Sequence, residues 1–235
     1  MKLSRPLSKG TLVKRYKRFL ADIELESGEI ITVHCANSGA MTSCAEPGRP
    51  VIISDSENPK RKLRFTWEQI KMGRTWVGVN TGTPNAAVAH WIEAGKIPEL
   101  AGYPELKREV KYGKEKKSRI DVYLSGKDGS PPCYVEVKNA TMRVDDYAAF
   151  PDAVTERGRK HLHELAWAAD QGARAVMFFF VGRSDCKKFR PADEIDAKYG
   201  EALREVAEKV ELLAYRCQYK ADGSVQPIES IPVEL

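Results

Sequence analysis

Apolar and charged residues alternate along most of the first 80 positions, in short runs that turn-forming residues separate. A period of two is typical of half-buried strands, and "ESGE" at 26–29 fits a hairpin turn between two of them. Strands at such regular spacing predict a small closed or partly open β-barrel. The runs cover residues 10–16, 19–35, 49–55, 61–71 and 74–80.

The pattern changes at "TGTPNAAVAHWIEAGKIPEL", residues 81–100. Pro84 and Asn85 can open a helix over 86–94 that Gly95 closes. We therefore expect one domain over 1–82 and another over 83–235. In the second, strands mixed with long helices predict an α/β sheet covered by helices. The expected strands are 107–112, 119–124, 133–138, 174–181 and 210–217, and the further helices are 153–170 and 193–209.

Composition narrows the class of protein. The longest apolar run, "AVMFFFV" at 175–181, is far shorter than the ~18 residues of a membrane span and fits a buried strand. The N-terminus has no apolar stretch behind its charges, so we expect no signal peptide. Five scattered cysteines without a C-x-x-C pair argue against a disulfide framework or zinc site. These features predict a cytoplasmic protein without a membrane partner.

Positive charge is concentrated in the first third of the chain. Residues 1–84 hold 14 Lys and Arg against 8 Asp and Glu, whereas the remainder holds 24 against 25. This asymmetry indicates a polyanion partner for the barrel, although a modest positive charge also serves solubility alone.

Two basic clusters on the predicted barrel are candidate nucleic-acid contacts. Lysine and arginine that follow a phosphate backbone, beside rings on which bases stack, suit a nucleic-acid-binding barrel. The alternative is that Phe19 and Phe65 are core and the lysines protect strand edges from aggregation. The basic residues are Lys14, Arg15, Lys17, Arg18, Lys60, Arg61, Lys62 and Arg64, with Tyr16, Phe19, Phe65 and Trp67 among them.

Candidate catalytic chemistry lies in "SRIDVYLSGKDGSPPCYVEVKNATM", residues 118–142. Alternation places Asp121 on one face of the first strand, and Glu136 and Lys138 on one face of the second. If the strands are neighbours, the two carboxylates can share Mg²⁺ or Mn²⁺, with Lys138 placed to stabilise developing charge. That arrangement suits metal-assisted phosphodiester hydrolysis. The alternative is a solvated strand face with a Glu136–Lys138 pair.

The segment "FPDAVTERGRKHLHELAWAADQG", 150–172, predicts a helix capped by Asp152. Arg157 and His161 are four residues apart and share a face, with Lys160 near them, so they could hold a phosphate or steady a water. A solvated amphipathic helix is the competing interpretation. Its expected apolar stripe is Val154, Leu162, Leu165 and Ala169.

The sequence leaves open which residue is the third acid of the site. Glu109, on the strand before Asp121, is one candidate, and Glu93, in the helix at 86–94, is the alternative.

Several long blocks of the chain resemble the sugar fermentation stimulation protein A (SfsA) family. They are "KRYKRFLADIEL", "HCANSGAM", "VKYGKEKKSRIDVYL", "YVEVKNATM" and "FPDAVTERGRKHLHEL". The resemblance implies an N-terminal oligonucleotide-binding (OB) barrel and a C-terminal α/β domain similar to the PD-(D/E)-x-K restriction-endonuclease-like nucleases. It places the nuclease pattern on Asp121, Glu136 and Lys138, with Ile120 where the motif's name has proline.

The family also implies non-specific DNA binding and a regulatory part in sugar (maltose) metabolism. Two functions of different class follow: a DNA-binding protein with a Mg²⁺-dependent nuclease site, and a catalytically inactive nuclease-fold transcriptional regulator. The sequence predicts DNA as the partner, single- or double-stranded, and leaves a homodimer open. Endo or exo cleavage is also open.

Overall fold

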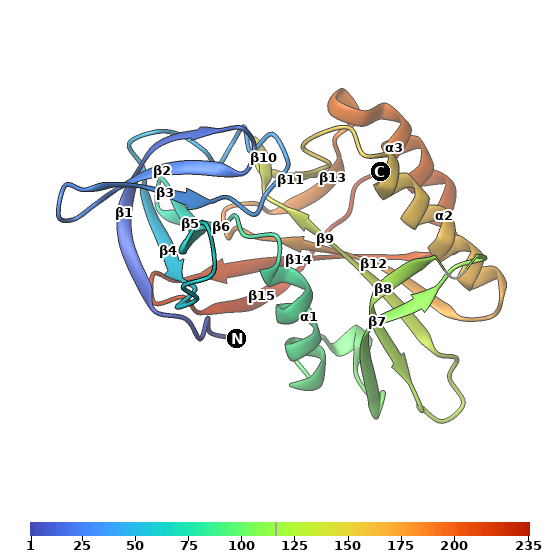
Figure 1. Cartoon of the computed structure of the whole chain (residues 1–235). Coiled ribbons are helices and arrows are strands. Elements are labelled where there is room, and N and C mark those ends of the chain that lie inside the picture. The colour runs from blue at the N-terminus through green and yellow to red at the C-terminus, as the bar shows by residue number, and fades with distance from the viewer. Residues whose placement is uncertain (116) are drawn as a thin grey trace.

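The N-terminal part of the chain forms the barrel that its alternating pattern predicts. In the computed structural model, which describes residues 1–115 and 117–235, six strands pair in the order β3-β2-β1-β4-β5-β6 (Figure 1). A bridge between His34 and Thr66 joins β3 to β5 and closes the sheet on itself. The strands are β1 (Leu7–Tyr16), β2 (Leu20–Leu25), β3 (Ile30–His34), β4 (Pro50–Asp55), β5 (Phe65–Met72) and β6 (Thr75–Gly78).

A second six-stranded sheet, with order β15-β14-β12-β9-β8-β7, organises the rest of the chain. Its centre is parallel, because β12 pairs in parallel with both β9 and β14, whereas β7, β8 and β15 add antiparallel edges. The strands are β7 (Glu105–Tyr112), β8 (Ser118–Ser125), β9 (Cys133–Ala140), β12 (Arg174–Val181), β14 (Glu211–Tyr219) and β15 (Val225–Ile231).

Helices cover both faces of this sheet. Helix α1 (Thr83–Glu93) buries Trp91 against Phe180 on one face, with the two rings stacked 5.4 Å apart. On the other face, α2 (Glu156–Asp170) and α3 (Asp193–Val206) pack over Met177 and Phe179 of β12. A short 3₁₀ helix, η1 (Pro98–Leu100), follows α1. β12, buried along almost its whole length, contributes to both cores, as expected of a central strand covered on two sides.

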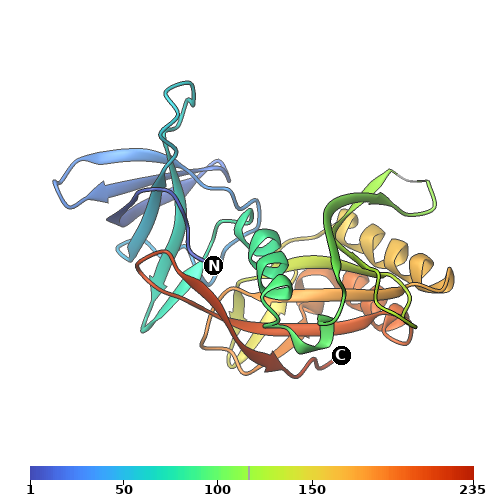
Figure 2. The same cartoon turned by 90° about the horizontal axis from the view of Figure 1, so that it is seen from below.

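The barrel and the α/β part are joined directly. Figure 2 shows the barrel beside the sheet, with α1 running away from their junction. The N–H of Gly78 in β6 donates to the carbonyl of Gly182, and the Ser43 hydroxyl donates to the carbonyl of Thr141. A small third sheet lies on the barrel side and consists of β10 (Met142–Val144), β11 (Tyr147–Phe150) and β13 (Lys188–Pro191).

The expected fold class, an OB-like barrel followed by a nuclease-like α/β domain, is confirmed. Helix α1 begins three residues earlier than its pattern indicates, because Pro84 is accommodated inside the first turn. The short strands of the third sheet carry no alternation long enough to signal them. β15 was also missed, since Pro227 and a register shift interrupt it. Among residues 1–115 and 117–235, no helix is long and apolar enough to span a bilayer.

Candidate active site

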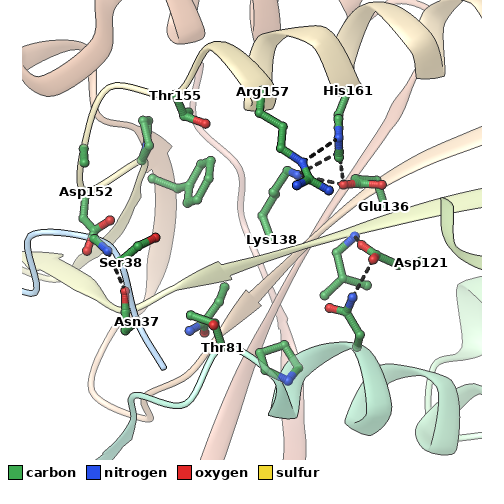
Figure 3. A pocket seen from close by; sticks show the side chains of 18 of the residues that line it. Asn37, Ser38, Thr81, Asp121, Glu136, Lys138, Asp152, Thr155, Arg157 and His161 are labelled. Carbon is green, nitrogen blue, oxygen red and sulfur yellow. Dashed lines mark hydrogen bonds and ion pairs between the residues drawn. The ribbon is translucent and has the colours of Figure 1, made fainter. Parts of the chain in front are cut away.

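A cleft of about 1080 Å³ lies between the barrel and the α/β part, and the predicted site residues line it (Figure 3). β7, β8 and β9 supply Glu109, Asp121, Glu136 and Lys138. Helix α2 supplies Arg157, Lys160 and His161 from the opposite side. The barrel contributes residues 37–39 and Thr81, which the sequence did not single out.

Asp121 sits where β8 separates from β9. The pairing of these strands is recorded at Leu124, Tyr123 and Val122, and Asp121 is the next residue of β8. Its carboxylate accepts the Val137 N–H of β9 at 2.7 Å, so a side chain takes the place of a strand–strand hydrogen bond. The other oxygen accepts the amide of Asn85 in α1 at 2.5 Å. The carboxylate is therefore fixed from two sides.

Glu136 is almost fully buried, with 2% of the residue exposed. Its Oε1 accepts the Lys138 ammonium at 2.7 Å and also contacts His161 Nδ1. Its Oε2 is buried and has no hydrogen-bond partner within the described part of the chain. A buried carboxylate oxygen without a donor is rare, because removing it from water is unfavourable.

The neighbours of His161 determine its tautomer. Arg157 donates from Nε to His161 Nε2 at 3.3 Å, so Nε2 accepts and Nδ1 carries the proton. The Nδ1–H then donates to Glu136 Oε1. Arg157, His161 and Glu136 form a chain of contacts from the solvent to the buried carboxylate, as the dashed lines in Figure 3 show.

Electrostatics separate the two carboxylates. Burial and the nearby charge of Glu136 raise the pKa of Asp121 to about 7. Burial alone would raise the pKa of Glu136, but the hydrogen bond from His161 and the charge of Lys138 outweigh it, so that pKa is lowered. The difference has a simple cause: Glu136 faces a cation, whereas the donors to Asp121 are neutral amides.

Of the two candidates for a third acid, only Glu109 reaches the cleft. It lies in β7 between Arg108 and Val110, which pair with the two residues that flank Asp121 in β8. It has a left-handed conformation with φ of 56°, and its charge contributes to the raised pKa of Asp121. Glu93 is exposed at the end of α1 and does not line the cleft, so that alternative is wrong. Within residues 1–115 and 117–235, no group of three His, Cys, Asp or Glu side chains is arranged to hold an ion.

The donor set fits a hard divalent cation in its chemistry. Asp121 and Glu136 offer carboxylate oxygens, the ligand type that Mg²⁺, Mn²⁺ and Ca²⁺ take. The buried Glu136 Oε2 lacks a partner that a cation would supply.

The residues of the first basic cluster, Lys14 to Arg18, differ in whether they already have partners within the chain. The Arg15 guanidinium donates to the carbonyls of Arg18, Asn37, Gly39 and Ala40, at 2.8 to 3.2 Å, so Arg15 holds a loop and is not free for phosphates. Lys14 pairs with Asp22 at 3.6 Å. Lys17 is exposed, and Arg18 lines the cleft.

The second basic cluster lies in the loop between β4 and β5. Lys60 and Lys62 are exposed. Arg61 donates to the Thr66 hydroxyl at 3.3 Å, and Arg64 is engaged by Asp55 at 2.5 Å. Asp55 therefore compensates the charge of Arg64, whereas Arg61, whose partner is a neutral hydroxyl, and the two lysines keep their positive charge.

The aromatic residues near these clusters divide in the same way. Phe19 is half exposed, whereas Trp67 is completely buried and donates its indole N–H to the carbonyl of Gln69. Trp67 is therefore a core residue, and the expectation that it stacks on bases is wrong. Phe65 is half-buried beneath the Arg64 guanidinium. Tyr16 is also half-buried, and its hydroxyl donates to Asp22.

The start of α2 differs from the prediction. Thr155, and not Asp152, caps the helix by accepting the Gly158 N–H at 3.0 Å. Asp152 instead accepts the Met41 N–H of the barrel at 3.1 Å. Val154 precedes the helix and is 70% exposed at the cleft, so it is not part of the apolar stripe.

The cleft carries more positive than negative charge. Among its described lining residues, six are basic and four are acidic, and four of the basic ones come from the α/β part outside the E-x-K motif. Sequence inspection missed Lys117 and Arg119, although both stand in the "KKSRID" run that leads to Asp121. The six are Arg18, Lys117, Arg119, Lys138, Arg157 and Lys160.

Comparisons with known proteins agree across the whole chain. The "SfsA N-terminal OB domain" matches residues 13–79, and the "Sugar fermentation stimulation protein RE domain" matches residues 82–223. A sugar fermentation stimulation protein homolog of Acidithiobacillus ferrooxidans is 55% identical over 219 residues, covering 92% of this chain and 93% of that protein. The homolog of Geobacter metallireducens is 50% identical over 236 residues, covering 100% of both chains.

A solved structure of SfsA from Pyrococcus furiosus, described as a complex with Ca²⁺, is also similar. It has a TM-score of 0.89 and 28% sequence identity, covering 100% of this chain and 98% of that one. Both halves of the chain, in this order, thus match a single family over nearly their full length. The chain belongs to the sugar fermentation stimulation protein family.

Proposed function

We propose that this protein binds DNA without regard to sequence and hydrolyses its phosphodiester bonds with the help of a divalent cation. The observation that carries the proposal is the convergence of Asp121, Glu136 and Lys138 at one basic cleft. Acid and lysine side chains at a cleft lined by further cations are what a phosphodiester substrate requires.

Asp121 and Glu136 are the residues that would hold the cation. When bound, Mg²⁺ or Mn²⁺ would lower the pKa of a water molecule and polarise the phosphate. The Ca²⁺ complex of the P. furiosus protein supports the expectation that this family takes up a divalent cation. The partnerless Oε2 of Glu136 supports it from this chain's own residues.

The side chains around the cation site would have different roles in hydrolysis. The oxygen of water bonds to phosphorus, the bond from phosphorus to one sugar oxygen breaks, and that oxygen takes up a proton. Lys138, 14% exposed at its side chain, would stabilise charge that develops on the phosphate. His161 and Arg157 hold Glu136 in place through the Nδ1–H contact, so we assign them positioning roles.

Contact with the phosphate backbone would come from exposed cations. Lys60 and Lys62 on the barrel and Arg119 at the cleft are exposed, as is Lys160, which also lies 3.8 Å from Glu164. Contacts of this kind recognise charge and not bases, so binding should fall steeply with salt.

A second candidate function is a DNA-binding regulator of sugar use that does not cleave. One observation favours it: Lys138 and His161 already engage Glu136, and two donors engage Asp121, so the polar network is largely satisfied without a cation. The family's description as sugar fermentation stimulation proteins is compatible with this role.

The test compares cleavage of end-labelled single- and double-stranded DNA in Mg²⁺, in Mn²⁺ and in chelator. We expect cleavage by the wild type with metal only, and loss of cleavage in Asp121→Asn and Glu136→Gln. The matched control is Glu93→Gln, an exposed acid outside the cleft. Metal-dependent cleavage that survives in Asp121→Asn would refute the site. Salt-sensitive binding without any cleavage would favour the regulator.

A further inference from the structure

At one end of the cleft the barrel contacts the α/β part, and we call this contact the wall. We define this wall as residues 37–39 together with Asp152, all of which line the cleft. The Asp152 carboxylate accepts the Met41 N–H at 3.1 Å and packs against Gly39 so closely that a Cβ there would lie 2.2 Å from it. Just beyond, the Ser43 hydroxyl donates to the Thr141 carbonyl at 3.2 Å. Figure 3 places Asp152, Asn37 and Ser38 together, away from Asp121 and Glu136.

The barrel side of the wall is rigid. Arg15 donates to the carbonyls of Asn37, Gly39 and Ala40, and Asn37 accepts the Gly39 N–H at 2.9 Å. Thr81 donates from its hydroxyl to the Ala36 carbonyl at 2.6 Å. These hydrogen bonds hold the loop in place at several points.

The chemistry of the wall differs from that of the rest of the cleft. Lys117 and Arg119 come from the β7–β8 segment and Lys160 from α2, and their charges attract phosphates. The wall presents an amide, a hydroxyl and the Asp152 carboxylate, while Arg18 stands nearby. A terminal phosphate would face a like charge at Asp152, whereas a terminal hydroxyl can donate a hydrogen bond to it.

The distance from the acids to the wall sets a length. Glu136 lies in β9, and Thr141, which directly follows β9, accepts the Ser43 hydroxyl beside the wall; five residues of extended chain correspond to roughly 16 Å. One strand of stacked DNA has a phosphate about every 3.4 Å, so at most about five nucleotides fit in that length, and fewer if the strand is extended.

We propose that the cleft receives the free, hydroxyl-bearing end of a single nucleic-acid strand, which stops against the wall while the chain behind it crosses Asp121 and Glu136. This inference rests on the proposed function for its chemistry, but the binding of an end does not. Hydrolysis in this geometry adds one water across one phosphodiester bond and releases a short piece of a few nucleotides. Val154, 70% exposed at the cleft, offers an apolar contact to a base or sugar near the end.

The first experiment separates end binding from cleavage. Asp121→Asn protein in chelator first binds a labelled linear 12-nucleotide strand of DNA. Unlabelled linear, circular or blunt duplex DNA of matched sequence is then added as the competitor. We expect linear single strands to compete at least about tenfold better than circles. Circles that compete as well as linear strands would overturn the inference. The wild type could cleave no DNA at all while linear strands remain the better competitors. In that case the proposed function fails and end binding stands.

The second experiment tests the wall itself. We compare the affinities of linear strands that carry a hydroxyl or a phosphate at the 5′ or the 3′ end. Each strand is measured with the wild type and with Asp152→Asn, whose amide oxygen can still accept the Met41 N–H. We expect the wild type to prefer one hydroxyl end about tenfold over its phosphate, and the variant to lose most of that preference. Asp128→Asn, an exposed acid on a distant turn, is the control. Equal binding of hydroxyl and phosphate ends by the wild type would refute the role of Asp152.

Discussion

Replacing Asp121 with asparagine should stabilise the metal-free protein, because that carboxylate is strained electrostatically. Its pKa is raised from 3.8 to about 7 by burial and by the charge of Glu136. A shift of roughly three units corresponds to about 4 kcal/mol of unfavourable free energy when the group is ionised. Asparagine can still accept the Val137 N–H, but it must reorganise its contact with Asn85. We therefore expect a net gain of about 2 kcal/mol.

The sign of the pH dependence follows from the same shift. Between pH 3.8 and about 7 the folded wild type holds a proton that the unfolded chain releases, so its stability falls as pH rises through that window. Asparagine does not titrate, so the Asp121→Asn variant does not lose this stability as the pH rises. The difference between the two proteins should be small near pH 4 and reach its full value above pH 7.

The assay is thermal and urea unfolding in chelator at several pH values, with Asp128→Asn as the control. A gain of about 2 kcal/mol corresponds to a rise in Tm of roughly 4–8 °C for a chain of this size. Addition of Ca²⁺ should stabilise the wild type by mass action and leave the variant unchanged. A variant that is less stable than wild type at pH 8, or a difference that does not vary with pH, would refute the reasoning.

Three further predictions concern the barrel and the wall. Lys62→Ala should lower the slope of log affinity against log salt by about 1, whereas Arg64→Ala, already paired with Asp55, should change it little; equal effects in DNA titrations would contradict this. Arg15→Met should lower the free energy of unfolding by about 1–3 kcal/mol, because it removes the donor from several carbonyls; an unchanged urea midpoint would show those bonds to be dispensable. Gly39→Ala should separate the barrel loop from the Asp152 carboxylate and weaken binding of strand ends, and unaltered competition by linear strands would count against the wall.

Much of the fold could be predicted from alternation and turn signals alone. The period of two placed Asp121, Glu136 and Lys138 on one face of their strands, and the turn between the strands made β8 and β9 neighbours. The spacing of four put Arg157 and His161 on one side of α2. These are local regularities of the backbone, which is why a single sequence carries them.

Other parts of the site follow only from tertiary structure. Met41 and Asp152 are 111 positions apart, and Asn85 and Asp121 are 36 apart, yet each pair shares a hydrogen bond. The pattern around Asp152 is that of a helix cap, and only the approach of the barrel loop decides that its carboxylate serves the wall instead. Alternation fixes which face a side chain takes, but not which distant backbone group will need an acceptor. The sequence by itself determined most strands of the barrel and of the large sheet, with the acids that they carry. The packing of barrel against sheet decided the shape of the cleft, because that shape depends on contacts between segments with no local signal in common.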